Sequence, residues 1–263
     1  MWFGDARFPL SEEVFEALLA GGANHVFVMP TTLRRAQVTP AHPYGHYDPR
    51  LGRSNAHWRN VDAAQLAQAV VADHAKWGFD TDWVFSNEIS YSQWRTSANE
   101  EYRLWLVAFV ESIASAGLTP AVYSPIADPR SEGDKWSALA AAGYVAVEAY
   151  LDAASVARAR DSSSYSATQY SVIRASYEAL GVPVDRCILV EHYSQTAGGA
   201  GWGRGGLALD DWLGVVAARI AGAREAGFTR FASYGWGYNP MSAPDGDIVA
   251  TATAYVDATP AEA

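Results

Sequence analysis

Hydrophobic and polar positions follow two patterns that alternate along the chain, one typical of buried strands and the other of amphipathic helices. The strand pattern is a short apolar run bounded by turn residues. It occurs seven times, at residues 2–5, 25–30, 83–87, 120–125, 144–148, 188–192 and 231–236. Because these runs are almost wholly apolar, we expect strands whose two faces are both covered.

Helical segments separate these strands. Ser11 precedes the first predicted helix, residues 12–20, and Asp62 precedes the second, in which apolar residues recur at helical spacing as far as Trp77. Further helices are expected at residues 102–113, 134–143, 165–180, 209–227 and 247–257. Strands separated by helices of this size indicate βα units and a parallel sheet.

This alternation predicts an α/β fold, a (β/α)8-like TIM barrel that forms one domain over residues 1–263 with a frayed tail at 258–263. A closed barrel of this class has eight strands, so the first strands are expected to be incomplete or irregular. The missing strand could lie in the long segment 31–61, which we otherwise expect to be a functional loop on the substrate-binding face. An open, doubly wound sheet is the alternative. It is disfavoured because no glycine-rich phosphate-binding sequence follows the first strand.

Three acidic residues, Glu88, Glu148 and Glu191, each end an apolar strand. In a parallel barrel these strand ends open on one face, where substrates bind. A carboxylate in such a place is costly to desolvate unless it is paired, and converging carboxylates perturb one another's pKa. The arrangement suits glycoside hydrolysis, which needs one protonated acid and one ionised carboxylate. A structural salt bridge with an arginine is the alternative for each of them.

The pair Asn87-Glu88 resembles the Asn-Glu pair that ends the fourth strand of the clan A glycoside hydrolases. There the glutamate is the acid/base and the asparagine holds the sugar 2-hydroxyl. The clan's nucleophile is a glutamate that ends the seventh strand, and Glu191 has that place in the strand count. The resemblance therefore implies a retaining glycoside hydrolase with Glu88 as acid/base and Glu191 as nucleophile. Glu148 is a supporting acid, or the nucleophile if the strand count is off.

The same resemblance implies contacts to a carbohydrate substrate. Trp236 resembles the tryptophan that the clan often carries on its eighth strand under the catalytic sugar, and Tyr150 and Tyr193 lie near positions of aromatic and hydroxyl partners. If residues 2–7 are the clan's second strand, Arg7 lies near an arginine that the clan often has.

The glycine-dense segment 196–206 is expected to be a mobile lid that carries Trp202 and Arg204. Chitinase-like barrels are a second comparison, because they carry an acidic run on the fourth strand. Asp80 and Asp82 lie too far before Glu88 to match that run, which argues against substrate-assisted chemistry.

Composition limits the partners. The formal net charge of −10 disfavours binding to nucleic acid or to an anionic membrane surface. We expect no cofactor and no metal, although His42, His46 and His57 share one segment and make a metal-dependent hydrolase an alternative. The single cysteine, Cys187, is expected to be a buried thiol.

Other properties stay open at this level. No signal peptide is evident in the first residues, which leaves open a mature or trimmed form that acts outside the cell. The oligomeric state and the sugar are undetermined. A non-catalytic carbohydrate-binding or adhesion module on the same scaffold is the principal alternative to an enzyme.

Overall fold

The structure is a computed structural model, and it describes residues 2–3, 26–28, 43–47, 61–77, 82–86, 89, 94, 100–124, 133–195, 201–234 and 245–259. Its strands form one closed barrel in the order β1 to β8. Every neighbouring pair is parallel, and β1 closes the ring because Trp2 pairs with Val26 of β2 and with Ser233 of β8. The predicted TIM barrel is therefore confirmed, and the open sheet is excluded.

The strand that the sequence pattern did not reveal is the third one, inside the 31–61 segment. The strands are β1 (Trp2–Phe3), β2 (Val26–Val28), β3 (Pro43–Tyr47), β4 (Trp83–Ser86), β5 (Thr119–Ser124), β6 (Tyr144–Glu148), β7 (Cys187–His192) and β8 (Phe231–Tyr234). The strand before Glu88 is thus the fourth, and the strand that contains Glu191 is the seventh, as the clan A resemblance requires. The assignment of residues 2–7 to a second strand was wrong, because Trp2–Phe3 is the first strand.

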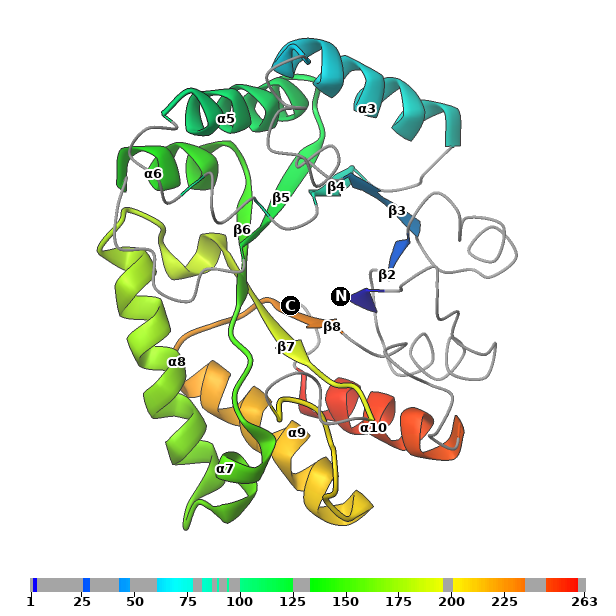
Figure 1. The fold of residues 1–263 in the computed structure, drawn as a ribbon, viewed down its shortest axis with the longest axis vertical. Helices are drawn as coiled ribbons and strands as arrows, with labels where there is room; N and C mark the ends of the chain where they lie inside the picture. The colour runs from blue at the N-terminus through cyan, green and yellow to red at the C-terminus, as the bar shows by residue number, and fades with distance from the viewer. Residues whose placement is uncertain are drawn as a thin grey trace.

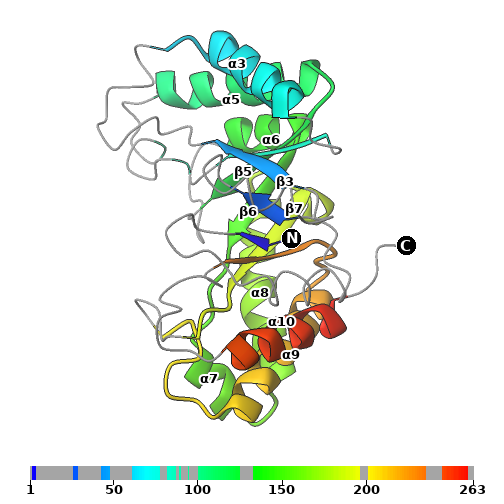
Figure 2. The ribbon, with the colours of Figure 1, turned by 90° about the vertical axis from the view of Figure 1, so that its right-hand side faces the viewer.

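The helices form an arc around the strands, as Figures 1 and 2 show. They are α3 (Ala63–Trp77), α5 (Glu100–Ser115), α6 (Gly133–Ala142), α7 (Ala153–Arg158), α8 (Ser162–Glu178), α9 (Leu209–Glu225) and α10 (Asp245–Ala258), with a 3-10 turn at Val184–Arg186. Asp62 caps α3 as predicted, since its Oδ1 accepts a hydrogen bond of 2.9 Å from the amide of Gln65. The short helix α7 was not expected, and the predicted helix at 12–20 lies outside the described residues.

In β4 to β8, the strands whose side chains are described, alternate residues belong to two separate cores. Among the described residues, the buried members of the core inside the barrel all come from strands: Phe85, Ala121, Tyr123, Ala146, Ile188, Val190 and Ala232. The other lies between the barrel wall and the helices and includes Val122, Val145, Val147, Cys187 and Leu189. The two cores show which side chains point inward and which point outward. Cys187 belongs to the outer core and is buried, as predicted.

Helices α8 and α9 approach each other closely at Gly222. A β-carbon at this position would lie 2.6 Å from the backbone nitrogen of Ala167 and 2.7 Å from the carbonyl oxygen of Ser163. Only glycine permits this approach, which brings the two helices together behind β7. Among the described helices, none has the length and apolar character that a membrane span needs.

Candidate active site

Glu148 points into the barrel at the carboxyl end of β6. The hydroxyl of Tyr123, an inward-facing residue of β5, donates a hydrogen bond of 3.2 Å to Oε2 of Glu148. The hydroxyls of Tyr123 and Tyr150 share a further hydrogen bond. Tyr150 follows Glu148 by two residues and packs against the inner core. One carboxylate and two phenols therefore gather at the face of the barrel where substrates bind.

An aromatic cluster borders this group. The ring of Tyr150 lies 5.2 Å from that of His192 and 5.0 Å from that of Trp202, and the rings of His192 and Trp202 are 6.0 Å apart. We call Tyr150, His192 and Trp202 the aromatic platform. Aromatic faces of this kind stack on the apolar faces of sugar rings.

The imidazole of His192 is held in its neutral form. Its Nδ1 lies 3.1 Å from the hydroxyl of Ser194. Burial lowers the pKa of His192 to about 4, and the nearby positive charge of Arg219 acts in the same direction. At neutral pH this ring is therefore uncharged, and at 4% exposure it is a buried support for the rings of Tyr150 and Trp202.

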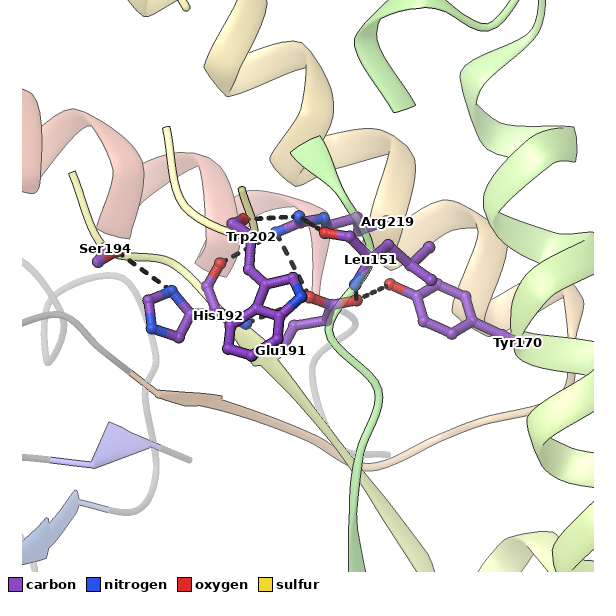
Figure 3. Close-up of polar contacts among 7 residues, drawn as sticks. All are labelled: Leu151, Tyr170, Glu191, His192, Ser194, Trp202 and Arg219. Atoms are coloured by element: carbon purple, nitrogen blue, oxygen red, sulfur yellow. Dashed lines mark hydrogen bonds and ion pairs between the residues drawn. The ribbon is translucent and has the colours of Figure 1, made fainter. Parts of the chain in front are cut away.

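Glu191 points the other way, out of the barrel and toward the helices. It is 2% exposed. Its Oε1 accepts hydrogen bonds from the hydroxyl of Tyr170 in α8 and from the amide of Leu151, the latter at 3.2 Å. Its Oε2 lies 3.4 Å from Nη1 of Arg219 in α9. In Figure 3, the phenol of Tyr170 and the imidazole of His192 lie on opposite sides of Glu191.

This position differs from the one expected for a nucleophile. Burial raises the pKa of Glu191, while Arg219 and the hydrogen bond from Tyr170 oppose that shift. Its carboxylate is surrounded by partners on the outer side of the barrel wall. The strict alternation of a strand then directs the next residue, His192, into the barrel, whereas the sequence analysis had placed Glu191 at the opening.

Arg219 is a residue that the sequence analysis missed. It is completely buried, and its guanidinium donates to three backbone carbonyls: to His192 at 3.0 Å, to Trp202 at 2.8 Å and to Leu151. The sequence contained a signal for it, namely an arginine on the helix face whose other members are aromatic, aliphatic or small. That face is the buried face of α9. A charged residue in such a stripe indicates a buried partner.

Tyr193 also lies outside the barrel. It is 1% exposed and packs against Trp212 and Tyr255, with ring centroids 6.1 and 5.2 Å away. Burial raises its pKa well above the usual value. A substrate in the barrel opening therefore has no access to this hydroxyl, in contrast to the prediction that Tyr193 contacts the sugar.

The described part of the glycine-dense segment, from Gly201 onward, is anchored. The carbonyl of Gly201 accepts a hydrogen bond of 3.0 Å from the amide of Ala153. The side chain of Arg204 pairs with Asp247 of α10, and its amide donates to the carbonyl of Ser194 at 3.0 Å. These contacts hold the backbone on both sides of Trp202, while residues 196–200 of the predicted lid lie outside the described residues.

Several predicted site residues lie outside the described residues, namely Arg7, Asn87, Glu88 and Trp236. The same holds for His42 and His57 of the metal hypothesis, while His46 lies within β3. Within the described ranges, no group of three or more His, Cys, Asp or Glu residues could hold a metal ion. Asp82 directly precedes β4 and accepts a hydrogen bond of 2.6 Å from Thr119, the first residue of β5, at the end of these strands away from the opening.

No known family profile matches this chain, and no curated protein shows significant sequence similarity to it. Solved structures do match. A GH5-4 broad-specificity endoglucanase from an uncultured bacterium is 13% identical, with a TM-score of 0.60 over 97% of this chain and 92% of the other. A GH5-4 endoglucanase from Ruminococcus champanellensis with bound cellotriose is 10% identical, with a TM-score of 0.57 over 95% and 86%.

A third structure has a different activity. An endo-β-N-acetylglucosaminidase from Cordyceps militaris is 13% identical, with a TM-score of 0.55 over 88% of this chain and 80% of that one. At these identities the likeness concerns the fold. The chain thus has a TIM barrel like those of the clan A glycoside hydrolases, and the solved structures that it resembles include enzymes that act on carbohydrates.

Proposed function

We propose that this protein is a glycoside hydrolase that cleaves a glycosidic bond in an oligo- or polysaccharide. The observation that carries the proposal is the hydrogen bond from Tyr123 to Glu148 at the barrel opening, beside an aromatic platform suited to a sugar. A carboxylate oriented by a phenol, with a stacking surface next to it, is what a reacting sugar needs. The fold shared with glycoside hydrolases supports the same conclusion.

The proposed chemistry uses Glu88 and Glu148. Glu88 donates a proton to the glycosidic oxygen while the carboxylate of Glu148 attacks the anomeric carbon, so that the leaving sugar departs as an alcohol. Glu88 then removes a proton from water, and the resulting hydroxide displaces Glu148 from the anomeric carbon. Glu148 takes the role that the clan assigns to a glutamate of the seventh strand, because Glu191 lies outside the barrel wall with its partners Tyr170 and Arg219.

Substrate contacts are assigned on the same grounds. Tyr150 and Trp202 offer ring faces beside Glu148, and the buried imidazole of His192 packs behind both rings. Asn87 and Trp236 keep their proposed roles at the 2-hydroxyl and under the sugar, because they follow β4 and β8. Arg7 follows β1 and is proposed as a further contact.

The experiment is a screen for hydrolysis of a polysaccharide panel that includes β-glucan, xyloglucan, xylan, mannan and chitin oligosaccharides. We expect reducing ends to appear with at least one of them, and we expect Glu88→Gln and Glu148→Gln to lose this activity with the fold intact by circular dichroism. Full activity in either variant would overturn the assignment of that residue. Proton NMR of the first anomer released shows whether the anomeric configuration is retained or inverted. Retention corresponds to carboxyls about 5–5.5 Å apart and inversion to about 6.5–9.5 Å.

A carbohydrate-binding module without catalysis is the second candidate. The aromatic platform favours it as strongly as it favours an enzyme, because stacking on Tyr150 and Trp202 does not depend on a reacting carboxylate. Calorimetric titration with the same panel separates the two functions. Binding without any release of reducing ends, with the affinity unchanged in Glu88→Gln, would select the binding module.

A further inference from the structure

We propose that Arg219 is a positioning residue that sets the geometry of the aromatic platform from behind the barrel wall. This inference rests on the proposed function in one respect, namely that the platform binds a sugar. The placement of Trp202 by Arg219 does not depend on that function and can be tested without a ligand.

The guanidinium of Arg219 connects three segments that are distant in sequence. Nη1 donates to the carbonyl of His192 at 3.0 Å, and Nη2 donates to that of Trp202 at 2.8 Å and to that of Leu151. Leu151 directly follows Tyr150, so each carbonyl belongs to a platform residue or to its neighbour. One side chain of α9 therefore fixes the backbone beneath all three rings, as Figure 3 shows for His192, Trp202 and Leu151.

Arg219 is itself held rigidly. Oε2 of Glu191 lies 3.4 Å from its Nη1, and the hydroxyl of Tyr170 holds the same carboxylate. The guanidinium carbon lies 5.5 Å from the ring centre of Trp212 and 5.8 Å from that of Tyr193, within the range of cation–π contact. The side chain is fully buried, and its planar group is thus fixed by charge on one edge and by aromatic rings around it.

Lysine cannot reproduce this arrangement. An ammonium carries the same charge and could keep the ion pair with Glu191, but it has three donors on a single nitrogen. The three carbonyls and the carboxylate are bound through two separate nitrogens of Arg219. Arg219→Lys therefore preserves the charge of the site while it releases part of the platform backbone.

The first measurement is fluorine NMR of protein labelled with 5-fluorotryptophan, in which Trp202→Phe identifies the Trp202 resonance. We expect the Trp202 resonance to shift or broaden in Arg219→Lys, and the resonance of Trp105, identified in the same way by Trp105→Phe, to stay unchanged. An unchanged Trp202 resonance in folded Arg219→Lys would overturn the proposal. If that variant does not fold, the paired variant Arg219→Met with Glu191→Gln removes both charges together, and the same outcomes apply to it.

The matched control is Arg174→Lys. Arg174 of α8 also joins α8 and α9, through a hydrogen bond of 2.9 Å to the carbonyl of Ala226. It pairs with Glu178 at 2.8 Å on the surface, near the carboxyl ends of both helices and away from the barrel opening. A change of the Trp202 resonance in this control as large as that in Arg219→Lys would show a general effect of loosened helix packing, and would also overturn the proposal.

The second measurement connects this position to sugar binding. On the polysaccharide that the wild-type protein hydrolyses fastest in the panel, we expect Arg219→Lys to raise KM about tenfold while kcat changes less than about threefold. A loss of kcat at unchanged KM would contradict a role in positioning the platform. If no polysaccharide is hydrolysed, the proposed function fails, and the fluorine measurement alone decides whether Arg219 positions Trp202.

Discussion

Glu191 and His192 are consecutive residues of β7 whose side chains lie on opposite sides of the barrel wall. The carboxylate of Glu191 meets Tyr170 and Arg219 of the helix layer, whereas the imidazole of His192 contacts Tyr150 and Trp202 at the opening. The residue that a strand count alone selects as a nucleophile thus has its partners in the helix layer, and its neighbour points toward the barrel opening.

The two glutamates should respond differently to removal of their charge. We expect Glu148→Gln to lower kcat by about a thousandfold or more, because the amide cannot attack the anomeric carbon. Glu191→Gln should lower kcat by less than about tenfold, since its amide oxygen can still accept the hydrogen bonds from Tyr170 and Leu151. Steady-state kinetics of the two purified variants check this. The opposite order of losses would restore Glu191 as the nucleophile.

The hydroxyl of Tyr123 should matter for activity, whereas that of Tyr177 should matter for stability alone. Tyr123 donates to Glu148, while Tyr177 shares a 3.0 Å hydrogen bond with Ser124 on the outer side of the same strand. We expect Tyr123→Phe to lower kcat about tenfold or more. Tyr177→Phe should keep kcat and lose about 1 kcal/mol in urea unfolding. Equal kinetic effects of the two substitutions would argue against the orienting role of Tyr123.

His192 should make the folded protein less stable as the pH falls. Its pKa is about 4 in the folded state against 6.5 for an unperturbed histidine. Between these values the unfolded chain binds a proton that the folded protein does not. The stabilisation is therefore complete above pH 6.5 and is lost as the pH falls toward 4, by about 3 kcal/mol in total.

The measurement is urea unfolding of the wild type and of His192→Gln at about pH 7.5 and pH 4.5. Because the carboxylates titrate in both proteins, the difference between the two pH-induced losses isolates the histidine. We expect the larger loss in the wild type. Parallel losses in the two proteins would show that His192 does not titrate in this way.

Two glycines of α9 offer a matched pair of substitutions. A β-carbon at Gly222 would overlap the backbone of α8, so Gly222→Ala should cost about 1–3 kcal/mol. No atom lies within 4 Å of a β-carbon at Gly214, so Gly214→Ala should stabilise the helix by about 0.5–1 kcal/mol. Thermal unfolding of both variants is the measurement, and a destabilised Gly214→Ala together with a neutral Gly222→Ala would refute the close contact of α8 and α9.

The alternation of apolar runs and helical faces was sufficient to predict the barrel, because most strands are covered on both sides and read as aliphatic or aromatic runs. The third strand was missed because its sequence, Pro-Tyr-Gly-His-Tyr, contains no aliphatic residue and lies in a segment rich in turn formers. Missing the third strand also caused the first to be misnumbered. Counting back from the fourth strand without it made the strand at residues 2–3 the second instead of the first.

The site was predicted in part. Strand alternation requires Glu191 and His192 to face opposite sides, but it does not say which of them faces the barrel interior. That choice depends on Tyr170 and Arg219, which lie 21 and 28 residues away along the chain and meet Glu191 only after α8 and α9 have packed on the barrel. The inward position of Glu148 follows from the same alternation in β6.

Arg219 donates its hydrogen bonds to main-chain carbonyls, and this determines which amino-acid substitutions the surrounding loops can accept. Carbonyl oxygens are present whatever the side chain, so substitutions at Leu151, His192 or Trp202 leave the acceptors of Arg219 in place. The loops after β6 and β7 can therefore exchange their side chains without losing the anchor that holds their backbones. A library that varies these loops over an unchanged Arg219 and Glu191 would be a sound starting point for changing the side chains at the barrel opening while the backbone stays in place.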